Sequence, residues 1–361
     1  MARCPVIVRV RLLGRTLAAI VVATTLTPVA ATADWPTYHL DPARTGNAAG
    51  QPFTRSLTNS WSRAVDGEVY AEPLVAGNRV LIATQNNSIY SLDPASGGVQ
   101  WGAHLGAAVP QSQLPCGNID PVGITGTPVI DLATGVIYAV GLVWVPGNRA
   151  SIRYQMFALN LSNGSVRWQR PISGFGSPFD PRYQGQRMAL SLSNGFVYIG
   201  FGGRSGDCGD YRGWIVAAPA DGVGGLIAFS AGGAFWASGG PSSDAAGNVF
   251  ATSGNTCGGC PVLNSETVLK LGPSLAVADY FTPSNQASLN STDTDLGSAT
   301  PALLGTGLVF QVGKEGVGYL LNQSNLGGTN HNVPAYSARV CSRTSDAAFG
   351  ASDWHAGAFR G

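Results

Sequence analysis

The sequence has little charge and few of the side chains that usually bind metals. Only 11% of its 361 residues are charged and the net charge is +1, whereas an ordinary soluble domain has about 25% charged residues. Basic residues do not cluster beyond the first 15 positions, so nucleic acid and anionic membranes are not expected partners. The four histidines are scattered without metal-binding spacing: His39, His104, His331 and His355.

Long amphipathic segments with a 3.6-residue period are also missing, so we expect short helices or none. Glycine and proline are abundant, with 49 and 22 residues, and the chain has eight Trp and 11 Tyr. Because 44% of the residues are hydrophobic, this composition predicts a packed core with many turns and not a disordered chain.

The N-terminus has the pattern of a signal peptide. Four arginines precede the apolar segment 16–29, and the small residues Ala31 and Ala33 form a cleavage site before Asp34. A membrane anchor is the alternative, but the segment is shorter than the roughly 20 residues that span a bilayer. No second apolar stretch follows, so we predict a secreted or cell-envelope protein without a membrane span, from which residues 1–33 are removed.

The rest of the chain repeats a pair of strands, a tight turn and a tryptophan. The first clear copy spans residues 76–101 and the second spans residues 135–168, and the spacing from Asp93 to Trp101 equals that from Asn160 to Trp168. Weaker copies of the strand pair start near residues 194, 248 and 307. Each strand is rich in β-branched and aromatic residues and is bounded by turn residues.

These repeats predict an all-β protein, a β-propeller of four-stranded blades. A single blade cannot bury its two apolar faces, whereas stacked blades bury them and large aromatics fill the wedge between neighbours. A β-sandwich is the alternative. We expect residues 34–361 to form one propeller domain of about five blades. The tail 341–361 is expected to open a further unit without reaching its strands, which leaves the propeller incomplete at the C-terminus.

The sequence resembles a known family, the PQQ-repeat β-propellers, which include the quinoprotein alcohol dehydrogenases. The repeats carry the resemblance over residues 35–325, and the opening WPTYH at 35–39 with RTG at 44–46 is similar to the family's first segment. The resemblance is specific for the fold and weak for activity, because many members of such folds are not enzymes.

In the dehydrogenases, pyrroloquinoline quinone (PQQ) lies on the propeller axis with Ca²⁺. Three segments resemble the family's site, SGN at 253–255, DTDLG at 293–297 and KEG at 314–316. The resemblance implies Asn255 as a metal ligand, Trp236 as the floor under the quinone, Asp295 as the catalytic base and Lys314 as the contact to a quinone oxygen. Such residue types suit an oxygen-rich Ca²⁺ site and proton abstraction from an alcohol.

Two cysteines depart from the family pattern. Cys116 stands alone where the family has two adjacent cysteines, and Cys208 stands where the family has its metal-binding Glu. In an oxidising compartment the two could pair, so the resemblance leads us to expect a Cys116–Cys208 disulfide that occupies part of the former cofactor pocket.

The motif Cys257-Gly-Gly-Cys260 has the spacing of half a zinc site or a redox dithiol. No second cysteine pair or His cluster accompanies it, and no helix start is expected there to lower a thiol pKa. We therefore predict a local Cys257–Cys260 disulfide, which leaves Cys341 as the odd thiol of the exported protein.

Two functions remain open from the sequence. The first is a binding or interaction module with a degenerate cofactor site and no cofactor, whose loop face binds a protein, a glycan or a small molecule. The alternative is a PQQ- and calcium-dependent alcohol or sugar dehydrogenase. A scaffold role in envelope assembly is a third, less specific interpretation. Whether the protein is an enzyme is left undecided.

Overall fold

The computed structural model describes residues 34–48, 60–176, 179–341, 353–355 and 358–360. In this part of the chain the backbone is almost entirely strand and turn. Its helices are short: α1 (Gln286–Ser291), η1 (Gln111–Gln113) and η2 (Leu296–Ser298). None of the described helices is long and apolar enough to cross a membrane. The expected signal peptide lies outside the described residues.

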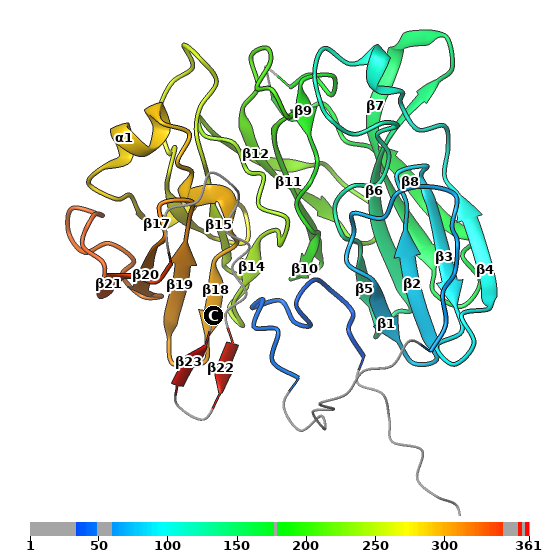
Figure 1. Cartoon of the computed structure of the whole chain (residues 1–361), viewed down its shortest axis with the longest axis horizontal. Coiled ribbons are helices and arrows are strands. Elements are labelled where there is room, and N and C mark those ends of the chain that lie inside the picture. The colour runs from blue at the N-terminus through cyan, green and yellow to red at the C-terminus, as the bar shows by residue number, and fades with distance from the viewer. Residues whose placement is uncertain (1–33, 49–59, 177–178, 342–352, 356–357, 361) are drawn as a thin grey trace, which may run out of the picture. The chain divides into compact units, whose positions relative to one another are not determined.

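Five antiparallel four-stranded sheets follow one another along the chain, and we call them blades 1 to 5 (Figure 1). Blade 1 comprises β1 (Leu74–Ala76), β2 (Arg79–Ala83), β3 (Ser88–Leu92) and β4 (Val99–His104). Blade 2 comprises β5 (Val129–Asp131), β6 (Val136–Val145), β7 (Asn148–Asn160) and β8 (Val166–Pro171). Blade 3 comprises β10 (Ser191–Ser193), β11 (Phe196–Gly203), β12 (Gly213–Pro219) and β13 (Ile227–Ala231), and β9 (Gln184–Gly185) pairs with the end of β11.

The last two complete blades have the same connectivity, in which each strand pairs with the next one in sequence. Blade 4 comprises β14 (Ser242–Ser243), β15 (Val249–Thr252), β16 (Val268–Leu271) and β17 (Val277–Phe281). Blade 5 comprises β18 (Ala302–Leu304), β19 (Leu308–Val312), β20 (Val317–Asn322) and β21 (Tyr336–Arg339). A separate pair follows, β22 (Asp353–His355) with β23 (Ala358–Arg360).

Strand composition follows burial within the blades. The middle strand β6 is buried at eight consecutive positions, which explains its continuous apolar sequence. The outer strand β8 is only half-buried or exposed at every position. Each large apolar cluster combines residues of two consecutive blades, as in the packing of Leu81 and Ile89 of blade 1 with Ile137 and Phe157 of blade 2.

Tryptophans join consecutive blades through the turns that the sequence repeats. The Trp101 ring of blade 1 covers Gly164 in a turn of blade 2, and its Nε1 donates to Leu161 O at 3.2 Å. Trp168 covers Gly222 of blade 3 in the same way. Gly164 has φ +72°, and a methyl group there would overlap the Trp101 ring. Glycine is therefore required for both its conformation and its lack of a side chain.

Trp61 repeats this contact one step earlier in the chain. Its ring covers Gly97 of blade 1 and its Nε1 donates to Pro94 O at 2.8 Å. Residues 60–66 form no strand. This copy was not predicted from the sequence, because Trp61 is not preceded by a recognisable strand pair.

The segment 35–44 contacts all five blades in their chain order. Backbone bonds connect it to β1, β5, β14 and β18: Trp35 with Val75, Pro36 with Ile130, Pro42 with Ser243, and Ala43 with Leu303. Its Arg44 is 1% exposed and donates to Leu190 O, just before β10, at 2.8 Å. Because the segment bonds to every blade, it holds their inner strands in place.

The prediction of an all-β propeller of four-stranded blades is confirmed, and helices are short as expected. The tail differs from the expectation, because residues 341–361 contain the strands β22 and β23. The aromatic and β-compatible residues of both segments permit such a strand pair. That the propeller is incomplete at its C-terminal side stays a prediction.

Candidate functional site

A cavity of about 660 Å³ lies among the loops that connect strands in all five blades. It is lined by all four residues that the resemblance assigned to a cofactor site: Trp236, Asn255, Asp295 and Lys314. They come from separate connections, before β14, after β15, before η2 and after β19. The fold thus brings together positions that are far apart in sequence, although their roles stay predictions.

Asp295 and Lys314 form a buried ion pair at the cavity wall. Their side chains are 2% and 8% exposed, and Lys314 Nζ lies 2.6 Å from Asp295 Oδ2. Asp295 Oδ1 accepts a hydrogen bond from the backbone N–H of Asn255 at 2.8 Å. Lys314 Nζ also lies 2.9 Å from Oδ1 of the exposed Asp293. Both oxygens of Asp295 are thus already bonded within the protein.

Burial sets the protonation of this cluster. Burial raises the pKa of Asp295, against the opposing effect of the Lys314 ammonium. Burial lowers the pKa of Lys314, but its bonds to Asp295 and Asp293 outweigh burial and raise that pKa overall. The raised pKa of Lys314 keeps it as an ammonium ion, which favours the carboxylate form of Asp295 against the effect of burial.

Glu266 lies behind Asp295 and was not identified from the sequence. It is 0% exposed, and its Oε2 accepts a hydrogen bond from Leu296 N–H at 2.6 Å. Burial and then the Asp295 carboxylate raise the pKa of Glu266 to about 9. Glu266 is therefore protonated at neutral pH, and its Oε1, which accepts no hydrogen bond, is the oxygen left to carry the proton.

Two cations lie near the half-buried Trp236 ring. Lys314 Nζ lies 5.2 Å and Arg187 Cζ 5.3 Å from the ring centroid, within the range of cation–π attraction. Arg187 also lines the cavity, and it forms no ion pair with any described residue. Burial lowers the pKa of Arg187. No motif of the sequence pointed to Arg187, since it stands alone just before an apolar run.

Disulfides and polar contacts connect the loops at the cavity rim. Cys116 and Cys208 are joined, with Cα atoms 6.1 Å apart. Their neighbours Gly117 and Asp207 line the cavity, whereas the two cysteines do not. The bridge was expected to occupy part of the pocket; it lies instead beside the cavity and leaves it open. Asn255 Nδ2 lies 3.5 Å from Asp207 Oδ2 and adds a contact between blades 3 and 4.

The resemblance leaves the cavity one carboxylate short of the family's calcium site. Ca²⁺ takes six to eight oxygen ligands, but the resemblance puts Cys208 where the family has its Glu, and the Asp295 oxygens are engaged by Lys314 and Asn255. Within the described residues, the one group of three His, Cys, Asp or Glu ligand atoms within 4.8 Å of each other is Asp210, Cys257 and Cys260. Those three residues do not line the cavity.

Comparisons with known proteins agree with this fold. Residues 58–200 match a family model described as outer membrane protein assembly factor BamB, of the PQQ repeat type. The quinohemoprotein alcohol dehydrogenase from Comamonas testosteroni superposes with a TM-score of 0.65 at 17% identity, over 84% of this chain and 52% of that chain. The chain has the PQQ-repeat β-propeller fold. The resemblance inferred from the repeats is thereby confirmed.

Two other dehydrogenase structures superpose on this chain to a similar extent. A europium-containing methanol dehydrogenase superposes with a TM-score of 0.65 at 16% identity, over 85% of this chain and 58% of that chain. A quinohemoprotein alcohol dehydrogenase from Pseudomonas putida superposes with a TM-score of 0.62 at 14% identity, over 85% of this chain and 48% of that chain. This chain spans about half the length of the solved structures it matches. A comparison with curated proteins found no match.

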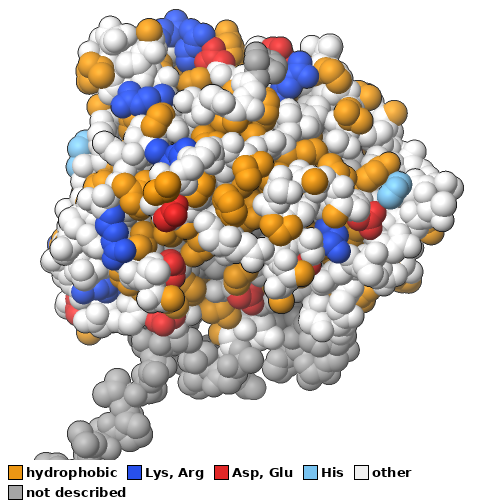
Figure 2. All heavy atoms as spheres, turned by 180° about the vertical axis from the view of Figure 1, so that it is seen from behind, with side chains coloured by type: hydrophobic (Ala, Val, Ile, Leu, Met, Phe, Trp, Pro, Cys, Tyr) orange, Lys and Arg blue, Asp and Glu red, His pale blue; other side chains and the backbone are white. Residues whose placement is uncertain are grey.

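The surface gives no further indication of a charged partner. On the face shown in Figure 2, basic and acidic side chains of the described residues are scattered among uncharged ones, without a patch of one sign. This distribution agrees with the low charge of the sequence.

Proposed function

We propose that this exported PQQ-repeat propeller is a binding module whose cavity takes a planar, carboxylate-bearing small molecule without a calcium ion. The observation that carries the proposal is Arg187, a cation at the wall of a cavity of about 660 Å³ with no ion-pair partner among the described residues. A guanidinium binds a carboxylate through two parallel hydrogen bonds.

Other groups of the cavity support the same ligand chemistry. Trp236 offers an indole for stacking against a flat ring. Lys314 is neutralised by Asp293 and Asp295, and Glu72 is held by hydrogen bonds from Trp35 Nε1 and His39 N–H. Arg204 also lines the cavity, but its guanidinium donates to the carbonyls of Arg182 and Pro181 and to Tyr154 Oη. Arg187 is thus the cation left to meet a ligand anion, and Trp236 is placed to stack on the ring that bears it.

The proposal is tested by titrating the full chain with PQQ, a planar tricarboxylate, and with an uncharged quinone of similar size. Binding is followed by quenching of tryptophan fluorescence and by calorimetry, in EDTA and in calcium. We expect PQQ to bind equally in both buffers and the uncharged quinone to bind at least about tenfold more weakly, which corresponds to about 1.4 kcal/mol. Arg187→Gln should weaken PQQ by about tenfold or more, whereas the surface control Arg79→Gln should not. Equal affinity of both variants, or no binding of PQQ, contradicts the proposal.

A PQQ- and calcium-dependent dehydrogenase is the second candidate, favoured by the meeting of Trp236, Asn255, Asp295 and Lys314 in one cavity. Against it, both oxygens of Asp295 already accept hydrogen bonds, from Lys314 and from the Asn255 N–H. Burial raises the pKa of Asp295, but these bonds act against that rise and so reduce its strength as a base. Dye-linked oxidation of a panel of alcohols and sugars, with PQQ and calcium present, distinguishes the two. Turnover lost in Asp295→Asn would establish the enzyme and overturn the binding module.

A further inference from the structure

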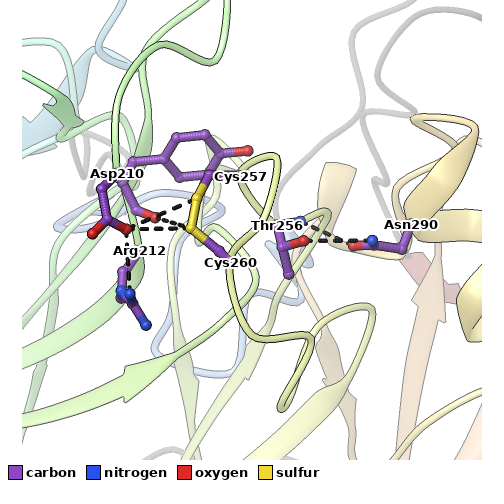
Figure 3. The surroundings of a disulfide bond; sticks show 7 residues. Asp210, Arg212, Thr256, Cys257, Cys260 and Asn290 are labelled. Carbon is purple, nitrogen blue, oxygen red and sulfur yellow. Dashed lines mark hydrogen bonds and ion pairs between the residues drawn. A yellow bond between two sulfur atoms is a disulfide. The ribbon is translucent and has the colours of Figure 1, made fainter.

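A second site lies on the loops between blades 3 and 4, outside the cavity. Asp210, in the loop between β11 and β12, points at the cysteines of the loop that follows β15 (Figure 3). Its Oδ1 lies 3.2 Å from Cys260 Sγ and 3.9 Å from Cys257 Sγ. All three ligand atoms lie within 4.8 Å of one another. A carboxylate and two sulfurs, from two blades, thus converge on one point.

The local backbone prepares this convergence. Cys260 N–H donates to Cys257 O at 3.0 Å, so the CGGC turn places both sulfurs on one side. Cys257 is 5% exposed and packs with Tyr211 and Ala234, which closes the inner side of the site. Gly258 and Gly259 leave open space on the outer side. The point between the three ligands is therefore reached from solvent.

In the structure the two sulfurs form a disulfide, with Cα atoms 5.2 Å apart. Disulfide sulfurs carry no proton, so Asp210 receives no hydrogen bond from them. Asp210 Oδ1 also lies 3.3 Å from Nη2 of Arg212, so zinc would compete with this guanidinium for the same oxygen. Two-electron reduction by a dithiol or a phosphine, with two protons, would convert the bridge into two thiols that face this carboxylate.

We propose that the reduced loop binds Zn²⁺ through Cys257, Cys260 and Asp210, and that the disulfide excludes the metal. Zn–S bonds of about 2.3 Å and Zn–O bonds of about 2.0 Å at tetrahedral angles put sulfur and oxygen about 3.5 Å apart. The two observed separations, 3.2 and 3.9 Å, lie on either side of that value. Metal entry thus requires the two sulfurs to part, while the carboxylate hardly moves.

Zinc binding displaces the thiol protons. Each of the two thiols loses its proton when its sulfur binds Zn²⁺, so one bound ion releases two protons. Three protein ligands leave the fourth tetrahedral position for water, as in open zinc sites. The proposal does not depend on the cavity, because none of its three residues lines it.

The test uses Co²⁺, a coloured stand-in for Zn²⁺, with the full chain in a Cys341→Ser background. Protein reduced with a phosphine should bind one Co²⁺ with intense tetrahedral bands and a thiolate charge-transfer band, and Zn²⁺ should displace it. The oxidised protein should bind none at this site. Asp210→Asn should weaken binding by at least about tenfold. Asp221→Asn changes another exposed carboxylate and should not weaken binding.

Two results would refute the zinc site. Thiolate-bound Co²⁺ that persists in Cys257→Ser/Cys260→Ser places the metal on Cys116 and Cys208 and refutes the site. Equal affinity of the two Asp variants removes Asp210 as a ligand and overturns the proposal. Near-ultraviolet circular dichroism of the oxidised variants checks that each retains the native fold.

Discussion

Loss of the Cys116–Cys208 bridge should destabilise the propeller far more than loss of the Cys257–Cys260 bridge. The first bridge closes a chain segment with a sequence separation of 92 residues, the second one of 3 residues. Loop-closure entropy at 25 °C then gives about 4.6 kcal/mol for the first bridge and about 1.6 kcal/mol for the second. A difference of about 3 kcal/mol is large relative to the usual 5–15 kcal/mol of total stability.

The measurement is urea unfolding of Cys116→Ser/Cys208→Ser and Cys257→Ser/Cys260→Ser, both in a Cys341→Ser background, followed by tryptophan fluorescence. Reversibility is checked by coincident unfolding and refolding curves. We expect a much larger drop in midpoint for the first variant at similar m-values. Equal losses would refute the argument, because they would mean that the unfolded chain gains no more freedom from the longer loop.

Three further predictions concern other buried features. Glu266→Gln should raise the free energy of unfolding relative to wild type, by an amount that grows from pH 5 to pH 8. The reason is that folded wild-type protein must keep a proton on Glu266, whose pKa is raised to about 9, while the unfolded chain releases that proton. A pH-independent difference would contradict this. Gly164→Ala should lower the free energy of unfolding, measured with a denaturant, more than Gly135→Ala does, since both glycines have positive φ but only Gly164 lies under the Trp101 ring. Equal losses, each of about 1 kcal/mol, would show that the ring plays no role. Arg44→Ala should lower the free energy of unfolding by at least about 3 kcal/mol, because it removes several charge-assisted hydrogen bonds to buried carbonyls. A loss below about 1 kcal/mol would show that the segment 35–44 does not hold the blades together.

The fold was predictable because its contacts repeat at fixed positions. The turn glycine and the tryptophan recur together, and in space Trp101 covers Gly164 of the following blade. A pattern within one stretch of sequence thus indicates a contact between two consecutive blades. Trp61 obeys the same rule with Gly97, so the sequence could have revealed it had the search started from the tryptophan and not from the strands.

The site was predictable only where the family resemblance named positions. Trp236, Asn255, Asp295 and Lys314 fall at motif positions, and the fold brings them to one cavity. Glu266 could not be found this way, because its importance arises from its approach to Asp295, which precedes a different strand of another blade. Asp210 is similar: its distance to Cys260 depends on how the loops of blades 3 and 4 meet.

The resemblance puts Cys208 where the family has its metal-binding Glu. Cys208 is bonded to Cys116, and two carboxylates at the cavity bond inward: Asp295 to Lys314, and Asp293 to the same ammonium. A metal would have to break these pairs without a full set of oxygens in return. A ligand carboxylate at Arg187 breaks none of them. These pairs support the proposed recognition by charge and stacking, which is why calcium-independent binding is the sharpest test of the proposed function.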